Sequence, residues 1–304
     1  MSQAAVAGDK LEGLVYGNSM QNECLVVADR QSWLTWWEGS LLPFEEIAVE
    51  KLASYGTVIL APDNAQYQAH CLQVIDWKRS GQLPDTRLIL GTYKGRHIWS
   101  PENDAQVEHW VVHARSERLV LASERLAFVP LCVMPPRKAF EPGDDGYLFM
   151  GGRKWRELGV GLEAMSRSGF PGRVVTDFAP EGDFPGVDVK REKIPKTEYI
   201  EVMSRARLVL VPLKDTPISH GHVDVVTAIS AGKPVLVTAG ASCDDYVEHG
   251  VNGLLVPDNS VEAWLEAIRV AYEKADEFAA AAREMAPRYH PAKYSQYLME
   301  IAQG

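Results

Sequence analysis

Two glycines followed by two cations are the first residues whose types and spacing could do chemistry. Gly151 and Gly152 end an apolar run that starts at Tyr147, and Arg153 and Lys154 come directly after them. Glycines let the backbone approach a ligand closely, and arginine and lysine neutralise phosphate oxygens. By itself the pattern leaves two interpretations open: a solvated pair of cations at a helix start, which is the commoner case, and a diphosphate-binding group made of Gly152, Arg153 and Lys154.

A short polar loop opens a helix further along the chain. Ser219, His220, Gly221 and His222 lead into a helix that we expect over about His222–Ala231. The free N–H groups and the dipole of a helix N-terminus attract anions. In an open α/β sheet such a terminus lies at the carboxyl edge, where ligands bind. We therefore expect an anionic ligand beside these residues.

A second polar loop, Gly240–Asp245, leaves the next expected strand at the same edge. Its side chains Ser242, Asp244 and Asp245 could therefore share one crevice with the polar loop before it. For any one of them an ordinary surface position is an equally good interpretation. Their convergence on one edge favours a common ligand site.

Polar residues also follow two apolar runs in the first half of the chain. Asp63 comes shortly after Thr57–Ala61, and His113 ends Trp110–His113. Because both runs are expected strands, both side chains would lie at the carboxyl edge of a sheet. Asp63 and His113 are therefore the candidates for a carboxylate and a general base in this half.

Two further features of the first half each have a structural and a functional interpretation. Trp33, Trp36 and Trp37 share one helix face at this spacing, and they either pack in the core or stack on a ring-shaped ligand. Lys94 and Arg96 form a basic loop, which either is a solvated turn or meets an anionic ligand.

Alternating strands and helices must position these residues. Short β-branched runs alternate with longer helical patterns, which predicts parallel sheets covered by helices. In the first half we expect strands at Gly13–Tyr16, Cys24–Ala28, Thr57–Ala61, Arg87–Leu90, Trp110–His113 and Ala127–Val129, and a helix over Pro43–Ser54. In the second half we expect strands at Tyr147–Met150, Arg173–Thr176, Leu208–Pro212, Val235–Thr238 and Leu254–Val256, and helices ending near Arg167 and over Lys196–Ser204, His222–Ala231 and Val261–Met285.

The expected fold class is α/β, with two Rossmann-like domains facing across a cleft. A chain of 304 residues suits two domains, because single hydrophobic cores stop growing beyond about 250–300 residues. The prolines at 135 and 136 and the Gly/Asp turn at 143–146 indicate a linker. We expect domains at 1–135 and 136–304, with the last helix, Pro291–Ala302, packing back on the first domain.

The bulk composition excludes several classes of protein. A net charge of −10 disfavours stable binding to nucleic acid. The four cysteines are far apart and form no CxxC pair, so we expect reduced, buried thiols and not a zinc site or a disulfide framework. No secretory signal and no apolar run of the roughly 18 residues of a spanning helix are present. We expect a cytoplasmic protein.

The segment Ser219–Ile268 resembles the donor-binding region of GT-B glycosyltransferases, in particular the GT4-like (group 1) family. The shared pattern is A-x-x-x-G-x-P-V at Ala228–Val235, a loop glycine at Gly240, and G-x-N-G-L-L-V at Gly250–Val256. The similarity covers most of residues 147–285. It implies transfer of a sugar from a nucleotide-diphosphate donor, with a UDP-sugar favoured, to an acceptor hydroxyl.

The resemblance also implies roles for individual residues. Gly152, Arg153 and Lys154 would hold the leaving diphosphate, and Gly221 and His222 would add the helix N-terminus. The first domain would supply the acceptor site, with Asp63 and His113 as its catalytic candidates. Members of the family need no metal for the chemistry, so we expect no metal and no cofactor besides the donor. The outcome favoured by the resemblance is retention.

The sequence departs from the family at two positions. The family commonly has two glutamates eight residues apart before A-x-x-x-G, and Ser219 and Thr227 occupy those places. Thr227 can hydrogen-bond a ribose hydroxyl, whereas the sugar contact would pass to His220, His222 or Asp224, which makes His220 a catalytic candidate. The departure keeps three alternatives open: an inactive sugar-nucleotide binder, a sugar-nucleotide epimerase, and a DNA-modifying glycosyltransferase.

Overall fold

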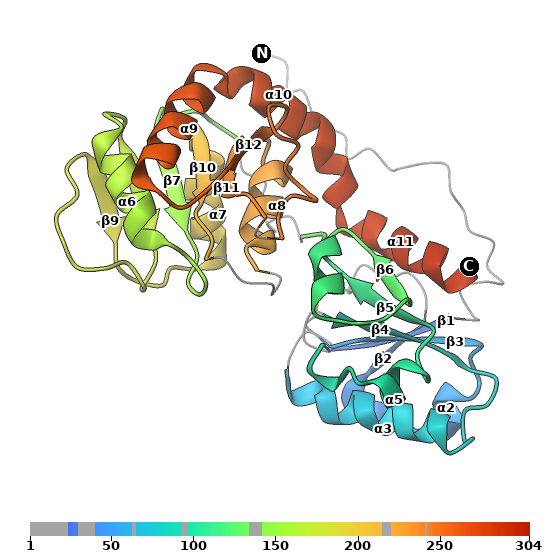
Figure 1. Ribbon diagram of the computed structural model, residues 1–304. Helices are drawn as coiled ribbons and strands as arrows, with labels where there is room; N and C mark the ends of the chain where they lie inside the picture. Colours follow the sequence, from blue (N-terminus) through green and yellow to red (C-terminus); the bar gives the residue numbers. More distant parts are fainter. Residues whose placement is uncertain are drawn as a thin grey trace, which may run out of the picture.

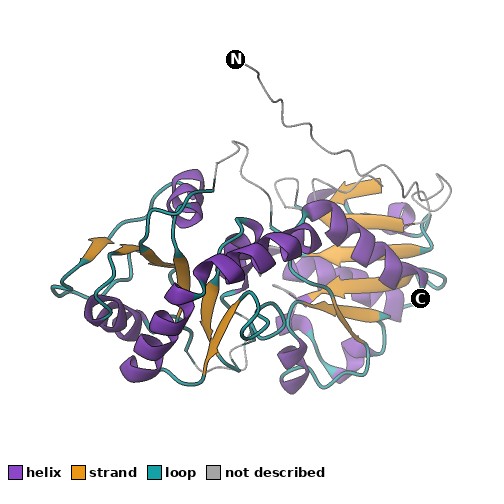
Figure 2. Ribbon diagram, turned by 90° about the horizontal axis from the view of Figure 1, so that it is seen from above, coloured by secondary structure: helices purple, strands orange, loops and turns teal. Residues whose placement is uncertain are grey.

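The computed structural model describes residues 24–29, 40–62, 65–92, 96–133, 142–214, 220–240 and 242–304. They form two six-stranded sheets in which every pairing between named strands is parallel. Helices lie on both faces of each sheet (Figures 1 and 2). The predicted α/β class with two Rossmann-like sheets is confirmed, whereas the boundary at residue 135 falls outside the described residues and stays a prediction.

The first sheet has the strand order β2-β1-β3-β4-β5-β6. Its strands are β1 (Cys24–Ala28), β2 (Ser40–Pro43), β3 (Thr57–Ala61), β4 (Arg87–Gly91), β5 (His109–Val112) and β6 (Leu126–Phe128). The helices between them are α2 (Val49–Leu52), α3 (Gln68–Arg79) and α5 (Pro101–Asp104), with short 3-10 turns at Phe44–Glu46, Ala65–Tyr67, Arg96–Ile98 and Arg115–Leu119.

The second sheet has the order β12-β11-β10-β7-β8-β9. Its strands are β7 (Leu148–Gly151), β8 (Gly172–Val175), β9 (Val187–Lys190), β10 (Leu208–Val211), β11 (Val235–Thr238) and β12 (Gly253–Val256). The helices are α6 (Leu158–Arg167), α7 (Lys196–Ser204), α8 (His222–Ser230), α9 (Val261–Glu273), α10 (Ala275–Met285) and, after a 3-10 turn at Ala286–Tyr289, α11 (Pro291–Gln303).

Both sheets are buried on both faces, which explains why their strands are almost continuously apolar. In the second sheet one face packs on α6 and α9 and the other on α7 and α8. In the first sheet one face packs on α3, and the other face packs on α11 through Tyr294, Leu298 and Met299. The C-terminal helix thus crosses from the second sheet to the first and completes the core there (Figure 1).

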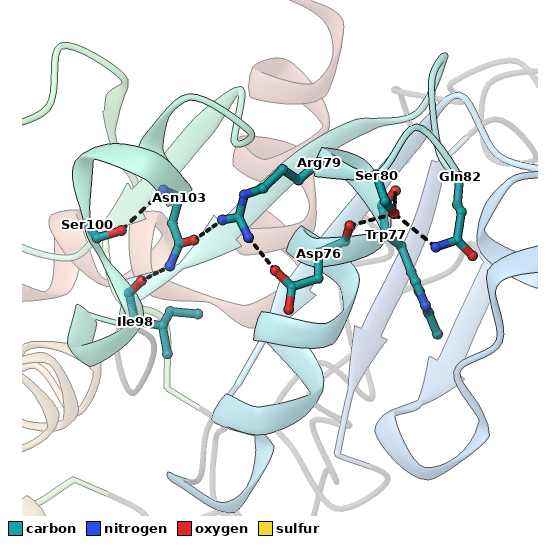
Figure 3. A network of polar contacts seen from close by, with 8 residues as sticks. All are labelled: Asp76, Trp77, Arg79, Ser80, Gln82, Ile98, Ser100 and Asn103. Carbon is teal, nitrogen blue, oxygen red and sulfur yellow. Dashed lines mark hydrogen bonds and ion pairs between the residues drawn. The ribbon is translucent and has the colours of Figure 1, made fainter.

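Polar contacts join the end of α3 to the segment around α5 (Figure 3). The Arg79 guanidinium pairs with Asp76 and donates to Asn103 Oδ1 at 2.6 Å. Asn103 in turn donates to the Ile98 carbonyl at 2.6 Å, while Ser100 caps α5. These contacts fix the loops after α3 and β4, and they involve none of the candidate site residues.

Three expectations about local structure were wrong. The helix predicted over Pro43–Ser54 is instead the end of β2, a 3-10 turn and the four-residue α2, because the extended Ala48 interrupts it. The helix predicted over Val261–Met285 is two helices that change direction at Lys274. Strand β9 was missed because it lies at the edge of the sheet, where it is only partly buried and contains charged residues. The strand expected at Gly13–Tyr16 lies outside the described residues.

The four cysteines are buried and unpaired, as expected. Within the part of the chain that is described, no helix is long and apolar enough to cross a membrane.

Candidate functional site

The strand order of the second sheet determines where a ligand can bind. The chain passes from β7 outward to β8 and β9, then returns to β10 on the other side of β7 and continues to β11 and β12. Ligands of open α/β sheets bind at such a switch point, outside the carboxyl ends of the two central strands. The two predicted groups follow these strands, since Gly152 to Lys154 come after β7 and Gly221 and His222 begin α8 after β10.

Gly152 has a conformation and a neighbourhood that a side chain would not fit. Its φ is 93°, and a Cβ atom there would lie 2.8 Å from both Arg156 Nε and Asp224 Oδ2. Glycine at this position therefore allows a buried ion pair between Arg156, ahead of α6, and Asp224, in the first turn of α8. The pair joins the loop after β7 to the helix after β10.

The Asp224 carboxylate has a second partner. The Tyr199 hydroxyl on α7 donates to Asp224 Oδ1 at 3.0 Å, and burial together with the Asp224 carboxylate raises the pKa of Tyr199. Arg156 and Asp224 thus fix three elements, the loop after β7, α7 and the start of α8, in one arrangement.

The N-terminus of α8 has the features predicted for an anion site. Gly221 is its left-handed N-cap, with φ at 85°, and no side chain caps the first turn. His220 and His222 flank it and are both buried. His220 Nε2 donates to the Lys214 carbonyl at 3.1 Å, and His222 Nε2 donates to the Ser242 carbonyl at 2.8 Å. Burial lowers the pKa of His222 to about 4, so that its ring is neutral at pH 7.

Arg153 and Lys154 are exposed on the loop that follows Gly152. The Arg153 guanidinium binds both oxygens of Asp177, at 2.8 and 2.7 Å, and lies 5.0 Å from the centre of the Phe178 ring. Hydrogen bonding to Arg153 lowers the pKa of Asp177. A fork of this kind has the geometry that also binds phosphate, and the role of Arg153 as a phosphate-binding group stays a prediction.

The second polar loop meets the first half of the chain. Asp245 accepts hydrogen bonds from the Arg115 backbone N–H and guanidinium at 2.7 and 2.8 Å. Asp244 instead accepts from the Gly240 N–H at 3.0 Å. Ser242 is buried, has a φ of 72°, and accepts a hydrogen bond from the His220 N–H at 3.4 Å. Of the three, Asp245 connects the sheets, while Ser242 and Asp244 shape the loop.

The comparisons with known proteins agree with this arrangement. Residues 185–274 match the family described as glycosyl transferases group 1. The match lies within the second half of the chain, where the resemblance to this family was predicted. No curated protein matches the sequence.

Solved structures with the same fold extend over nearly the whole chain. Anabaena HepE is 12% identical, with a TM-score of 0.63 over 92% of this chain and 99% of that one. The sucrose-phosphate synthase of Thermosynechococcus elongatus is 15% identical, with a TM-score of 0.59 over 87% and 80%. The catalytic domain of starch synthase IV from Arabidopsis thaliana is 10% identical, with a TM-score of 0.60 over 84% and 75%. The chain therefore has the GT-B fold, and its glycosyltransferase activity and its place in the GT4 subgroup stay predictions.

Of the two positions where the resembled family commonly has glutamates, the structure describes one. Thr227 is buried on α8. Ser219 lies outside the described residues, as do Asp63, Lys94 and the three tryptophans Trp33, Trp36 and Trp37. The roles assigned to Ser219 and Asp63 therefore stay predictions.

His113 lies at the end of β5, where it was expected, but inside the protein. It is buried between the first sheet and α11, with its ring 5.9 Å from Tyr294, and Nδ1 donates to the Val129 carbonyl at 2.8 Å. Burial lowers its pKa. Its carbonyl accepts from the Tyr246 hydroxyl of the second sheet at 2.6 Å. These contacts give His113 a part in joining the domains, and its catalytic role stays a prediction.

Sequence reasoning missed several residues of the site. Arg156 and Tyr199 stand in ordinary helical contexts, and only the fold brings them to Asp224. Glu117, buried near His113 and accepting from the Thr92 hydroxyl at 2.8 Å, follows β5 without a recognisable motif. Trp155 is adjacent to the predicted cations, so its position alone could have identified it. Among the described residues no three His, Cys, Asp or Glu side chains are placed to hold a metal ion.

Proposed function

We propose that this protein transfers a hexose from a nucleoside diphosphate sugar, with UDP as the favoured nucleotide, to a hydroxyl group of an acceptor, with retention at the anomeric carbon. The observation that carries the proposal is the adjacency of the Gly152 loop and the N-terminus of α8 at the switch point, held together by Arg156 and Asp224. Structures of the similar Anabaena HepE contain UDP, UDP-glucose, or UDP and glucose, and that of starch synthase IV contains ADP.

The diphosphate would bind between Gly152 and Gly221. Gly152 is half-buried beside the Arg156–Asp224 ion pair, and at Gly221 the helix N-terminus offers N–H groups that no side chain caps. Arg153 would exchange the Asp177 carboxylate for phosphate oxygens, and Lys154 would add a second charge. These groups would stabilise the charge that develops on the departing diphosphate, which is where such a reaction gains most.

The sugar and the acceptor would meet next to His220. The Nε2 hydrogen bond to the Lys214 carbonyl orients the imidazole beside the helix N-terminus. In this proposal His220 contacts the reacting sugar in place of the family glutamate, and Asp63 and His113 belong to the acceptor side. Positioning of the two substrates supplies the rest of the rate enhancement.

A thermal-shift and calorimetric screen with UDP, GDP, ADP and dTDP tests the donor site. One diphosphate should raise the midpoint of unfolding, and Arg153→Ala should weaken its binding about 10- to 100-fold, as expected for loss of a charge-assisted pair worth about 1.5–3 kcal/mol. Arg269→Ala is the matched control, because Arg269 makes a similar bidentate pair with Glu266 within α9. If none of the four nucleotides binds to the wild type, the proposal fails.

Turnover separates transfer from the alternatives. The nucleoside diphosphate that the screen selects is then supplied as its hexose ester, the nucleoside diphosphate sugar. The protein should release diphosphate from this ester, and the rate of release should rise when an acceptor is present. An inactive binder would bind the ester without releasing diphosphate, and an epimerase would convert the sugar without an acceptor. A DNA-modifying enzyme would show steeply salt-dependent binding to DNA.

A further inference from the structure

Trp155 has a backbone conformation that large side chains rarely adopt. Its φ is 59°, in the left-handed region, and such residues cluster at functional sites because the surrounding structure must hold them there. Trp155 lies between the two central strands of the switch point, after β7 and opposite the end of β10.

The chain on both sides of Trp155 is fixed to the segment after β10. The Lys214 N–H donates to the Trp155 carbonyl at 3.1 Å, and the Glu157 N–H donates to the Pro212 carbonyl at 3.0 Å. Between them Arg156 pairs with Leu213 as an isolated antiparallel bridge and holds Asp224 through its side chain. The left-handed residue is therefore built into the rigid part of the fold.

The indole is nevertheless exposed. Trp155 has 48% of its surface accessible to solvent, whereas tryptophan is highly buried on average. Its one aromatic neighbour among the described residues is His220, whose ring centre lies 6.3 Å away at an angle of 51°. The buried His220 precedes the N-cap of α8, so the exposed indole stands beside the proposed diphosphate site.

An exposed tryptophan in a fixed place suits one class of ligand surface. The face of an aromatic ring is electron-rich, and the C–H groups on one face of a pyranose are weakly positive and apolar. We propose that Trp155 stacks on the hexopyranose ring of the donor and thereby determines which sugar is accepted. This inference rests on the proposed function and names the residue that reads the sugar.

The position next to His220 favours the sugar over the nucleobase. In a nucleoside diphosphate sugar the hexose is attached to the β-phosphate, at the opposite end of the diphosphate from the nucleoside. His220 and Gly221 are consecutive, so a residue that touches His220 lies within about one sugar length of a phosphate at the helix N-terminus. Stacking there adds to the affinity for the ester without adding to the affinity for the free diphosphate.

Calorimetry of Trp155→Gly and Trp155→Phe tests the assignment, with the diphosphate selected by the screen and its hexose ester as probes. Glycine adopts a φ near 59° without strain, so Trp155→Gly should fold at least as well as the wild type. We expect it to bind the ester about 2- to 12-fold more weakly and the free diphosphate equally well, since one aromatic stack is worth about 0.5–1.5 kcal/mol. Trp155→Phe should recover most of the difference.

Val251→Ala is the control for loss of an exposed apolar side chain, because Val251 is 46% exposed in the turn before β12. An equal loss of affinity for diphosphate and ester would place the indole on the nucleoside and overturn the inference. Unchanged affinities for both, with a higher acceptor KM, would place it on the acceptor and overturn it too. If the wild type binds neither probe, the proposed function itself fails, which is a separate result.

Discussion

The buried ion pair between Arg156 and Asp224 gives the sharpest prediction about what holds the site together. Only 6% of the Arg156 side chain and 14% of the Asp224 side chain are accessible. Removing one member of such a pair leaves an uncompensated charge in the interior and destabilises a protein by about 3–5 kcal/mol. Arg156→Met and Asp224→Asn should therefore each lower the free energy of unfolding by about this amount.

The neighbours of the pair decide which variant is worse. Asp224 without Arg156 keeps the hydrogen bond from Tyr199, whereas Arg156 without Asp224 keeps only the Lys154 carbonyl, at 3.2 Å. Arg156 Nε already lacks a hydrogen-bond partner. Asp224→Asn should therefore cost more than Arg156→Met, and the double variant should cost less than the sum of the two by about 2–3 kcal/mol.

Urea unfolding of the four proteins in the double-mutant cycle measures this coupling. The control is the pair Arg153–Asp177, which is bidentate and has side chains 52% and 30% accessible. Coupling in that cycle should be about 1 kcal/mol or less, because solvent screens exposed pairs. Equal coupling energies in the two cycles, or single variants of the buried pair that cost under about 1 kcal/mol, would refute the reasoning from burial.

Three further predictions concern single positions. Because burial lowers the pKa of His222 from 6.5 to about 4, the unfolded chain binds a proton first as the pH falls. The protein should therefore lose about 3 kcal/mol of stability between pH 6.5 and 4, and His222→Gln should flatten this slope in urea titrations. Gly152→Ala should cost about 2–4 kcal/mol from its φ of 93° and its contact with the buried ion pair, and calorimetry should show weaker diphosphate binding; an unchanged midpoint of unfolding would contradict this. Tyr246→Phe leaves the buried Leu131 N–H and His113 carbonyl without their partner, so thermal unfolding should report a loss of about 2–3 kcal/mol, and a loss no larger than that of an exposed tyrosine would count against the interdomain role.

The parts of the site that the sequence predicted are those that local chemistry determines. Gly152 and Gly221 were recognised because a positive φ at the end of a strand or the start of a helix requires glycine. The strands of the second sheet were recognised because burial on both faces makes them continuously apolar. Strand β9 escaped because an edge strand is half exposed, and its alternating Val and charged residues resemble a loop.

The parts that the sequence did not predict depend on contacts between distant segments. Arg156 and Asp224 are 68 positions apart, and nothing in either local pattern indicates that they form a pair. Their meeting follows from the strand order, which places β7 beside β10. Trp155 was passed over for a related reason, since its left-handed φ is imposed by pairing with residues 212–214 and leaves no mark on the sequence.

His113 shows how one correctly located residue can acquire a different interpretation. The sequence placed it at the carboxyl end of a strand, and β5 ends at Val112, just before it. What the sequence could not supply was α11, which returns from the second sheet and covers this end of the first. The same helix that completes the core buries His113, and Tyr246 then uses the His113 carbonyl to hold the domains together. In a protein with two Rossmann-like domains, a polar residue at a strand end can therefore position the second domain as readily as it can contact a substrate.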